Sequence, residues 1–228
     1  FLNLYPLDVE SGSPKEISLD GTARTLGTEK RRIYDIINVL ESLEMAVKAG
    51  KNRYLWYGQS ALPATLAKLK SIAIRLGMKE QIQEIQMANR AFTGERYEVA
   101  IDNPNLTMSF EEIPEEESPG DAAIKEDKSL GAMCQKFVML FLISMKNGVI
   151  NLDIAAKVLI GDLDDSTAEI TDNASRSRSK TKVRRLYDIA NVLTAIGLIR
   201  KVYMDDRTIR KPVFQYIGPD VNLHDRDT

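Results

Sequence analysis

The sequence is poor in the side chains that build disulfides and metal centres. Its 228 residues include one cysteine, Cys134, and one histidine, His224. A single cysteine excludes a disulfide framework within the chain, and a zinc site, which takes several such ligands, is not expected. Cys134 stands in an apolar stretch, so we expect a buried core residue. This composition suits a reducing compartment.

Motifs for catalysis and membrane insertion are also missing. The sequence has no G-x-G-x-x-G loop, no P-loop and no Ser/His/Asp set, and its histidine lies in an acidic tail. We therefore predict no enzyme activity, no cofactor, no metal and no small-molecule substrate. The longest apolar run, "FVMLFLISM" at 137–145, fits a buried helix and predicts no membrane partner. Because the first residue is Phe1, we expect a fragment of a longer chain.

The whole chain has little net charge, but its segments differ strongly in net charge. The net charge is −2. Residues 59–127 carry 7 Lys and Arg against 13 Asp and Glu, whereas residues 128–218 carry 15 against 9. A basic region is therefore hidden behind an acidic connector.

A repeated pattern is what the sequence does contain. "RRIYDIINVL" at 31–40 returns as "RRLYDIANVL" at 184–193, with eight of ten letters identical. "ISLDGTARTL" at 17–26 is echoed by "INLDIAAKVL" at 150–159, with Ser18 or Asn151 in a capping position. "YLWYG" at 54–58 is echoed by "FQYIG" at 214–218, which is the alternation of a strand that ends in a turn.

Each copy therefore predicts three helices followed by a two-stranded hairpin, a mainly α fold with small β wings (α+β). The first helix of the second copy is expected at 128–145, and "FLNLYP" at 1–6 is expected to be the end of its counterpart. The second copy carries an insertion, Gly161–Lys180, which is polar and predicts a surface loop. The predicted domains are 1–58 and 128–218, joined by a helical connector at 59–109 and an acidic linker at 110–127, with an acidic tail at 219–228.

The connector has an apolar helical face. Leu62, Leu66, Leu69, Ala73 and Leu76 fall on one side of the predicted helix, and such a stripe must be covered. Because the apolar heptad is short and Gly77 interrupts it, packing within the chain is favoured over a coiled coil.

The repeated helix separates an apolar face from a polar one. Ile33, Ile37 and Leu40 share the core side, whereas the arginines, Tyr, Asp and Asn share the other. Cations in the first turn, after an expected N-cap at Thr28, oppose the helix dipole at a cost of roughly 0.3–1 kcal/mol each. Such placement in both copies indicates that an anion binds there.

Paired arginines at the start of a helix suit a reader of the DNA major groove, because a guanidinium matches the acceptors of guanine bidentately. The predicted base-reading residues are Arg31, Arg32, Arg184 and Arg185. Predicted contact or orienting residues are Tyr34, Asp35, Asn38, Tyr187, Asp188 and Asn191. Predicted phosphate ligands are Lys30, Lys48, Lys51, Arg53, Lys180, Lys182, Arg207, Arg210 and Lys211.

Helix–helix–helix–wing with R-R-[IL]-Y-D-I-x-N-V-L resembles the E2-factor/dimerisation-partner family of cell-cycle transcription factors, which are winged-helix proteins. Two tandem winged-helix domains in one chain resemble the atypical branch of that family. The resemblance implies a nuclear, sequence-specific binder of double-stranded DNA that reads TTTCCCGC-like promoter sites with both domains on one duplex. It also implies a repressor that does not require the dimerisation partner, and leaves open a homodimer or a heterodimer with a related atypical member.

Two other functions fit winged helices. A protein–protein interaction scaffold is the alternative, although a scaffold has no need of paired arginines at two helix N-termini. RNA binding would favour exposed stacking aromatics, whereas the wing aromatics are predicted to alternate inward.

Overall fold

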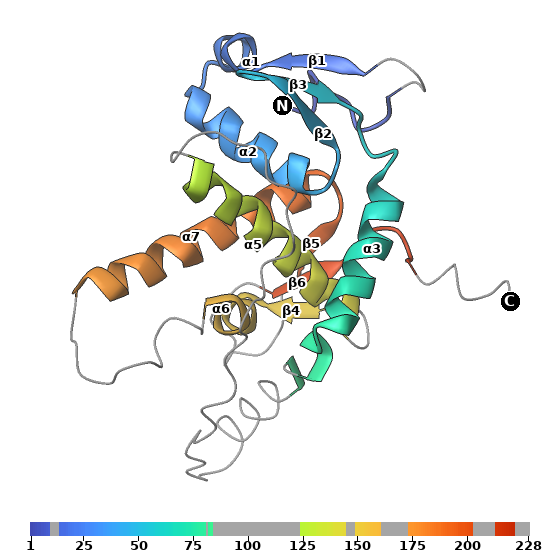
Figure 1. The fold of residues 1–228 in the computed structure, drawn as a ribbon, viewed down its shortest axis with the longest axis vertical. Coiled ribbons are helices and arrows are strands. Elements are labelled where there is room, and N and C mark those ends of the chain that lie inside the picture. Colours follow the sequence, from blue (N-terminus) through green and yellow to red (C-terminus); the bar gives the residue numbers. More distant parts are fainter. Residues whose placement is uncertain are drawn as a thin grey trace, which may run out of the picture.

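The computed structural model describes residues 1–9, 14–80, 82–83, 124–144, 149–160, 173–202 and 213–221. The repeat is visible in it as two similar sets of helices and strands, one above the other (Figure 1). Each set has a small antiparallel sheet beside its helices, which is the α+β class that the sequence predicts.

The first copy begins with a short strand. Its elements are β1 (Lys15–Ser18), α1 (Leu19–Leu26), α2 (Lys30–Ser42), β2 (Ala46–Gly50) and β3 (Arg53–Trp56). The three strands form an antiparallel sheet in the order β1-β3-β2. The repeated motif therefore lies on α2, and β2 and β3 form its wing.

The second copy has the same order of elements. They are β4 (Val149–Asn151), α6 (Leu152–Ile160), α7 (Asn173–Ala195), β5 (Ile199–Val202) and β6 (Val213–Tyr216), with strand order β4-β6-β5. The repeated motif lies in the second half of α7.

Two further helices join the copies. These are α3 (Leu62–Arg75), which follows the first wing, and α5 (Ile124–Ile143), which opens the second copy. In Figure 1, α5 runs through the middle of the molecule and packs against α2 and α3 as well as α6 and α7. The buried side chains of both copies consequently form one continuous hydrophobic cluster.

Local chemistry explains where α1 begins and ends. The Ser18 hydroxyl accepts a hydrogen bond from the backbone N–H of Gly21 at 3.2 Å, which confirms the predicted cap. Gly27 ends the helix in the left-handed region at φ 60°, where a residue without Cβ is least strained. In the wing, Tyr54 and Trp56 are buried, as their alternation predicts.

The sheets differ from the prediction by one strand each. The sequence predicts two-stranded hairpins, whereas β1 and β4 add a third strand to each sheet. These strands are only three or four residues long, so they lack the length over which alternation is detectable. Ile17, the buried residue of β1, fits the apolar pattern of the helix that follows it in the sequence.

Residues 1–6 form a hydrogen-bonded turn, in which the Phe1 carbonyl accepts from the N–H groups of Leu4 and Tyr5, and the bond from Tyr5 has the spacing of a helical turn. A second prediction is wrong. The insertion Gly161–Lys180 is not all loop, because α7 already begins at Asn173. Residues 173–180 contain no proline or glycine, so the helix that the motif nucleates continues through them.

The connector stripe is covered within the chain. Leu62, Leu66, Leu69 and Ala73 are buried on α3, whereas Leu76 is 41% exposed, contrary to its predicted place in the stripe. The rest of the connector and the acidic linker lie mostly outside the described residues. Among the residues that are described, no helix has the length and apolarity needed to cross a membrane.

Candidate nucleic-acid interface

The N-terminus of α2 is left open. The helix begins at Lys30, and the N-cap is Glu29 rather than the predicted Thr28; the Glu29 side chain makes no capping hydrogen bond. The first turn contains no acidic residue. The Arg32 N–H donates to the Glu29 carbonyl at 3.0 Å, and no side chain caps the other N–H groups of this turn, an arrangement that leaves them available to an anion.

Two acidic side chains orient the cations of this turn. Lys30 Nζ lies 2.8 Å from Asp20 Oδ1 of α1, and Arg31 Nε lies 3.4 Å from Asp35 Oδ1, one turn further along α2. The Arg31 side chain remains 62% exposed. Exposed pairs of this kind contribute only about 0–1 kcal/mol to stability, so their effect is mainly to restrict where the cation points. Asp20 was not predicted from the sequence.

A hollow of about 420 Å³ lies between α2 and the wing formed by β2 and β3. Its lining is formed by Leu19, Lys30, Arg31, Tyr34, Lys48, Lys51, Asn52 and Tyr54. The structure thus brings together the predicted ligands of α2 and those of the wing tip, which are separated in the sequence. Cations around a concave surface suit the phosphate backbone of a nucleic acid.

Asn52 also lines this hollow, and it is not among the ligands predicted from the sequence. It lies in the turn between β2 and β3 with φ 61°, a left-handed conformation that asparagine tolerates better than most residues. The sequence feature that could have identified Asn52 is its place directly after Gly50 and Lys51, at the expected turn of a hairpin.

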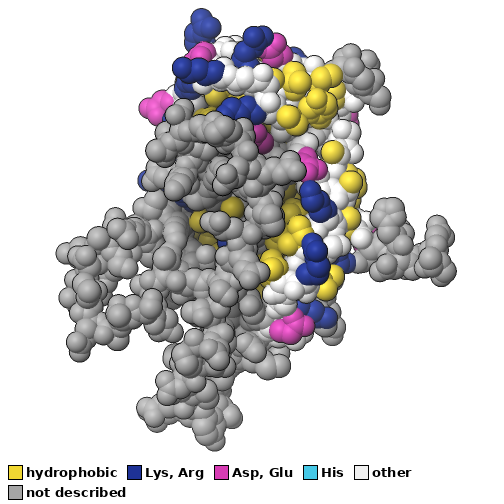
Figure 2. Space-filling model, viewed as in Figure 1, with side chains coloured by type: hydrophobic (Ala, Val, Ile, Leu, Met, Phe, Trp, Pro, Cys, Tyr) yellow, Lys and Arg dark blue, Asp and Glu magenta, His cyan; other side chains and the backbone are white. Residues whose placement is uncertain are grey.

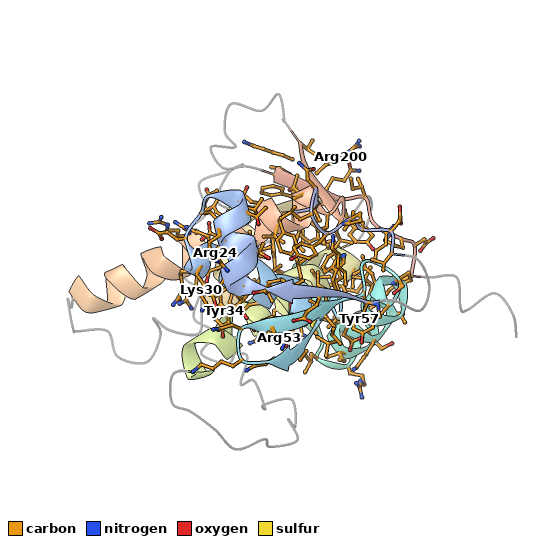
Figure 3. All side chains as sticks on the ribbon, turned by 90° about the horizontal axis from the view of Figure 1, so that it is seen from above. Arg24, Lys30, Tyr34, Arg53, Tyr57 and Arg200 are labelled. Carbon is orange, nitrogen blue, oxygen red and sulfur yellow. The ribbon has the colours of Figure 1, made fainter. Side chains whose placement is uncertain are left out.

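Cations lie on more than one part of the surface, since Figure 2 shows Lys and Arg side chains along α3 as well as at the top of the molecule. Figure 2 shows Lys and Arg side chains over α1 and the start of α2, at the top of the molecule. From above, Arg24, Lys30 and Tyr34 lie together near the start of α2, and Arg200 of the second wing lies on the opposite side from Arg53 (Figure 3). The two wings therefore lie on different sides of the molecule.

Arg53 is less available than predicted. Its guanidinium forms an ion pair and hydrogen bond with Glu16 of β1, and this bond lowers the pKa of the Glu16 carboxyl. In the second wing, Arg200 donates to Gln215 Oε1 from Nε and Nη2 at 2.9 and 2.7 Å. Both arginines thus have intramolecular partners on their own sheet.

The start of α7 differs from the start of α2. Arg184 is exposed and Arg185 is half-buried, but α7 begins at Asn173, eleven residues before Arg184. The interpretation that these arginines lie in a first turn is therefore wrong for the second copy. They lie instead along the middle of a longer helix, whose side chains at 173–182, including Lys180 and Lys182, are not described.

A second cavity, of about 490 Å³, lies between the two reading helices. Arg32 and Asp35 line it from α2, and Asp188 and Asn191 line it from α7. Arg31 and Arg32 thus diverge, one toward the wing hollow and the other toward the space between the copies. Tyr187, also predicted as a contact, is partly buried against the core.

Asn38 does not reach the surface as a contact residue would. It is 8% exposed, and its Nδ2 has no hydrogen-bond partner among the described residues, whereas its counterpart Asn191 is exposed. The difference arises because α5 packs over α2 at this point. The predicted ligands Arg207, Arg210 and Lys211 lie outside the described residues, and the described part of the chain holds no cluster of three metal-ligating side chains.

Comparison with known proteins agrees with this geometry. The model of the E2-factor/DP family winged-helix DNA-binding domain matches residues 1–58 and 126–218. The chain is 43% identical over 222 residues to transcription factor E2F7 of Xenopus tropicalis, covering 96% of this chain and 25% of that protein. For transcription factor E2F8 of Homo sapiens the identity is 39% over 234 residues, covering 97% of this chain and 26% of that protein.

The chain therefore spans about a quarter of the length of these relatives. The family match falls on both copies of the repeat, so each copy is a winged helix, with the repeated motif on α2 in the first and on α7 in the second. Transcription factors of this family are DNA-binding regulators rather than enzymes, as the missing catalytic motifs predict. By its two winged helices and by these matches, the chain belongs to the E2-factor/DP family of DNA-binding transcription factors.

Proposed function

We propose that the two winged helices bind one DNA duplex together, at GC-core promoter sites of the TTTCCCGC type. The observation that carries this proposal is the direction of the reading helices. Both α2 and α7 begin on the same side of the molecule, the left of Figure 1, and approach each other at their far ends, while α5 runs beside α2 and crosses α7. A duplex on that side would meet the start of α2 and, on α7, Arg184, which lies eleven residues after that helix begins.

The cations support the same orientation. The open N-terminus of α2, Arg31 and the wing hollow lie where α2 begins, and Arg184 is exposed on α7. Within this proposal Arg31, Arg32, Arg184 and Arg185 read guanines. Lys30, Lys48 and Lys51 contact phosphates, which fixes the register without reading sequence.

A second winged helix in the same chain replaces the one that the dimerisation partner supplies in typical family members. The proposed protein therefore binds DNA without that partner, acts in the nucleus and represses cell-cycle genes. The packing of both copies into one hydrophobic cluster supports a preassembled pair of this kind.

A band-shift titration with the purified chain alone tests the function. We expect a GC-core duplex to be bound at least about 10³-fold more tightly than its scrambled control, the lower end for specific binders. Footprinting should show protection over two adjacent segments, one of which shrinks when Arg184 and Arg185 are replaced by alanine. Protection of a single segment that the double replacement leaves unchanged would contradict binding by both domains.

A further inference from the structure

The helix α5 belongs to one copy by sequence and to both copies by packing. It opens the second winged helix and contacts α6, α7 and the second sheet, yet it also packs along α2 and α3 of the first copy. The relative position of the two reading helices therefore depends on how closely α5 approaches α2.

Gly131 lies at a close contact between α5 and α2. A Cβ atom at this position would lie 3.3 Å from Ser42 Cβ and 3.7 Å from the Asn38 carbonyl oxygen, both on α2. One turn further along the same face, Gln135 Nε2 donates to the Ser42 carbonyl at 3.0 Å, and Cys134 is fully buried. A glycine inside a helix costs up to about 1 kcal/mol relative to alanine, so its position at this contact is consistent with a need for close approach.

The opposite side of α5 is held by α3, which is tied to the end of the reading helix. Thr65 Oγ1 of α3 donates to Glu44 Oε2 at 2.6 Å, and Lys68 Nζ lies 3.8 Å from Glu44 Oε1. Glu44 follows α2 directly, in the left-handed region at φ 58°. With Leu66 and Leu69 buried, α2 and α3 hold α5 between them.

We propose that Gly131 is a specificity-determining residue, because its contact with Ser42 fixes α7 relative to α2 and so sets the one spacing of half-sites that the protein accepts. This inference rests on the proposed binding of one duplex by both winged helices. Adding one base pair between half-sites rotates them by roughly 34° and separates them by about 3.4 Å. A pair of reading helices held by α5 cannot follow that change.

Duplexes that differ only in spacing test the proposal. The chain would be titrated by fluorescence anisotropy against the parent site and against duplexes with one or two base pairs inserted at its centre. For the wild-type chain we expect a single insertion to weaken binding on the order of 10²-fold, because the second domain no longer engages together with the first. Binding of all spacings within about twofold, while mutation of either half-site remains harmful, would overturn the inference and leave the proposed function standing.

Gly131→Leu separates this role from a general loss of binding. We expect it to weaken the parent site and to reduce the ratio between parent and inserted duplexes, because α5 is pushed away from Ser42. The matched control is Ala132→Leu, which makes a similar addition at the next, exposed position of α5 and should leave the ratio unchanged. An unchanged ratio in Gly131→Leu would overturn the proposal. If that variant does not fold, Gln135→Ala, which removes only the hydrogen bond to Ser42, decides in its place.

A measurement without DNA completes the test. Spin labels at Arg24→Cys and Thr194→Cys, both exposed sites, report the distance between the copies, and the buried Cys134 stays unlabelled. We expect one narrow distance distribution that Gly131→Leu broadens and Ala132→Leu does not. A broad distribution in the chain without these packing changes would overturn the inference whatever the DNA results.

Discussion

Arg31 is held by Asp35 but remains largely exposed, which is the state expected of a side chain that awaits a base. We predict that Arg31→Ala costs about 1–3 kcal/mol of binding free energy and relaxes the preference for guanine at one position, because a bidentate contact is lost. Competition binding with single-base substitutions measures both effects. Equal weakening of the specific and scrambled duplexes would show that Arg31 contacts phosphate instead.

Lys51 at the wing tip should behave differently. It lines the hollow beside α2 but has no guanidinium to match a base edge. We predict that Lys51→Ala weakens specific and scrambled duplexes alike and lowers the slope of log K against log[salt] by about one. Titrations at several salt concentrations check this. A change confined to the specific duplex would assign Lys51 to base reading.

Burial of the Cys134 thiol makes the stability of the fold depend on pH. Burial raises the pKa of its thiol from 9.0 to about 12, while the hydrogen bond with Ser42 opposes the shift. Because the folded-state pKa lies above the unfolded one, the associated stability is complete below pH 9.0 and is lost as the pH rises toward about 12.

We predict that the free energy of unfolding falls above pH 9.0 with a contribution from Cys134 of up to about 1.4 kcal/mol per pH unit. Urea titrations at increasing pH measure the slope. The same series on Cys134→Ala should lack this contribution. Identical slopes in the two proteins would exclude the thiol as its source.

At this scale the sequence predicts the chemistry of a residue better than its accessibility. The Arg31–Asp35 pair follows from helical spacing alone, and the structure contains it. The burial of Asn38 does not follow, since Asn191 occupies the same position of the repeat and is exposed. The difference depends on α5, a helix from the other copy, which no local pattern encodes.

Buried and exposed apolar residues of the connector helix α3 are expected to contribute differently to stability. Leu66 is fully buried, whereas Ile74, two turns further along, is 60% exposed. We predict that Leu66→Ala lowers the free energy of unfolding by about 2–5 kcal/mol, because it leaves a cavity against α5. The matched control Ile74→Ala should stay within about 0.5 kcal/mol of the unchanged chain. Denaturant titration compares them, and equal losses would show that α3 is not packed as described.

Whole elements were predictable where a long pattern supports them and not where a boundary depends on context. The 3.6-residue period identifies α2 and the motif half of α7, and the apolar stripe identifies α3. The short strand β1 pairs with β3, about 40 residues further along the chain, and β4 pairs with β6, more than 60 residues further along. Their partners, rather than their own letters, make them strands.

At the scale of the whole molecule, the two copies are asymmetric although their motifs are not. Asn38 of α2 is buried where α5 packs, while its counterpart Asn191 of α7 is exposed and lines the cavity of about 490 Å³. The first winged helix also receives α3, and the described part of the second copy, which ends at Val221, has no equivalent helix. Equal motifs therefore do not imply equal shares of the binding free energy.

The position of α5 has a consequence for how the chain folds. The first winged helix buries one side of α2 only when α5, which lies more than 80 residues further along, has docked. The first copy therefore cannot complete its core alone, and we expect the chain to unfold as a single cooperative unit, with a calorimetric enthalpy equal to the van't Hoff enthalpy. Cleavage of the peptide chain between α3 and α5 should yield two pieces that remain associated as a noncovalent complex, and the first piece should refold only when it is mixed with the second. Separate melting transitions for the two pieces would mean that each copy is an autonomous folding unit.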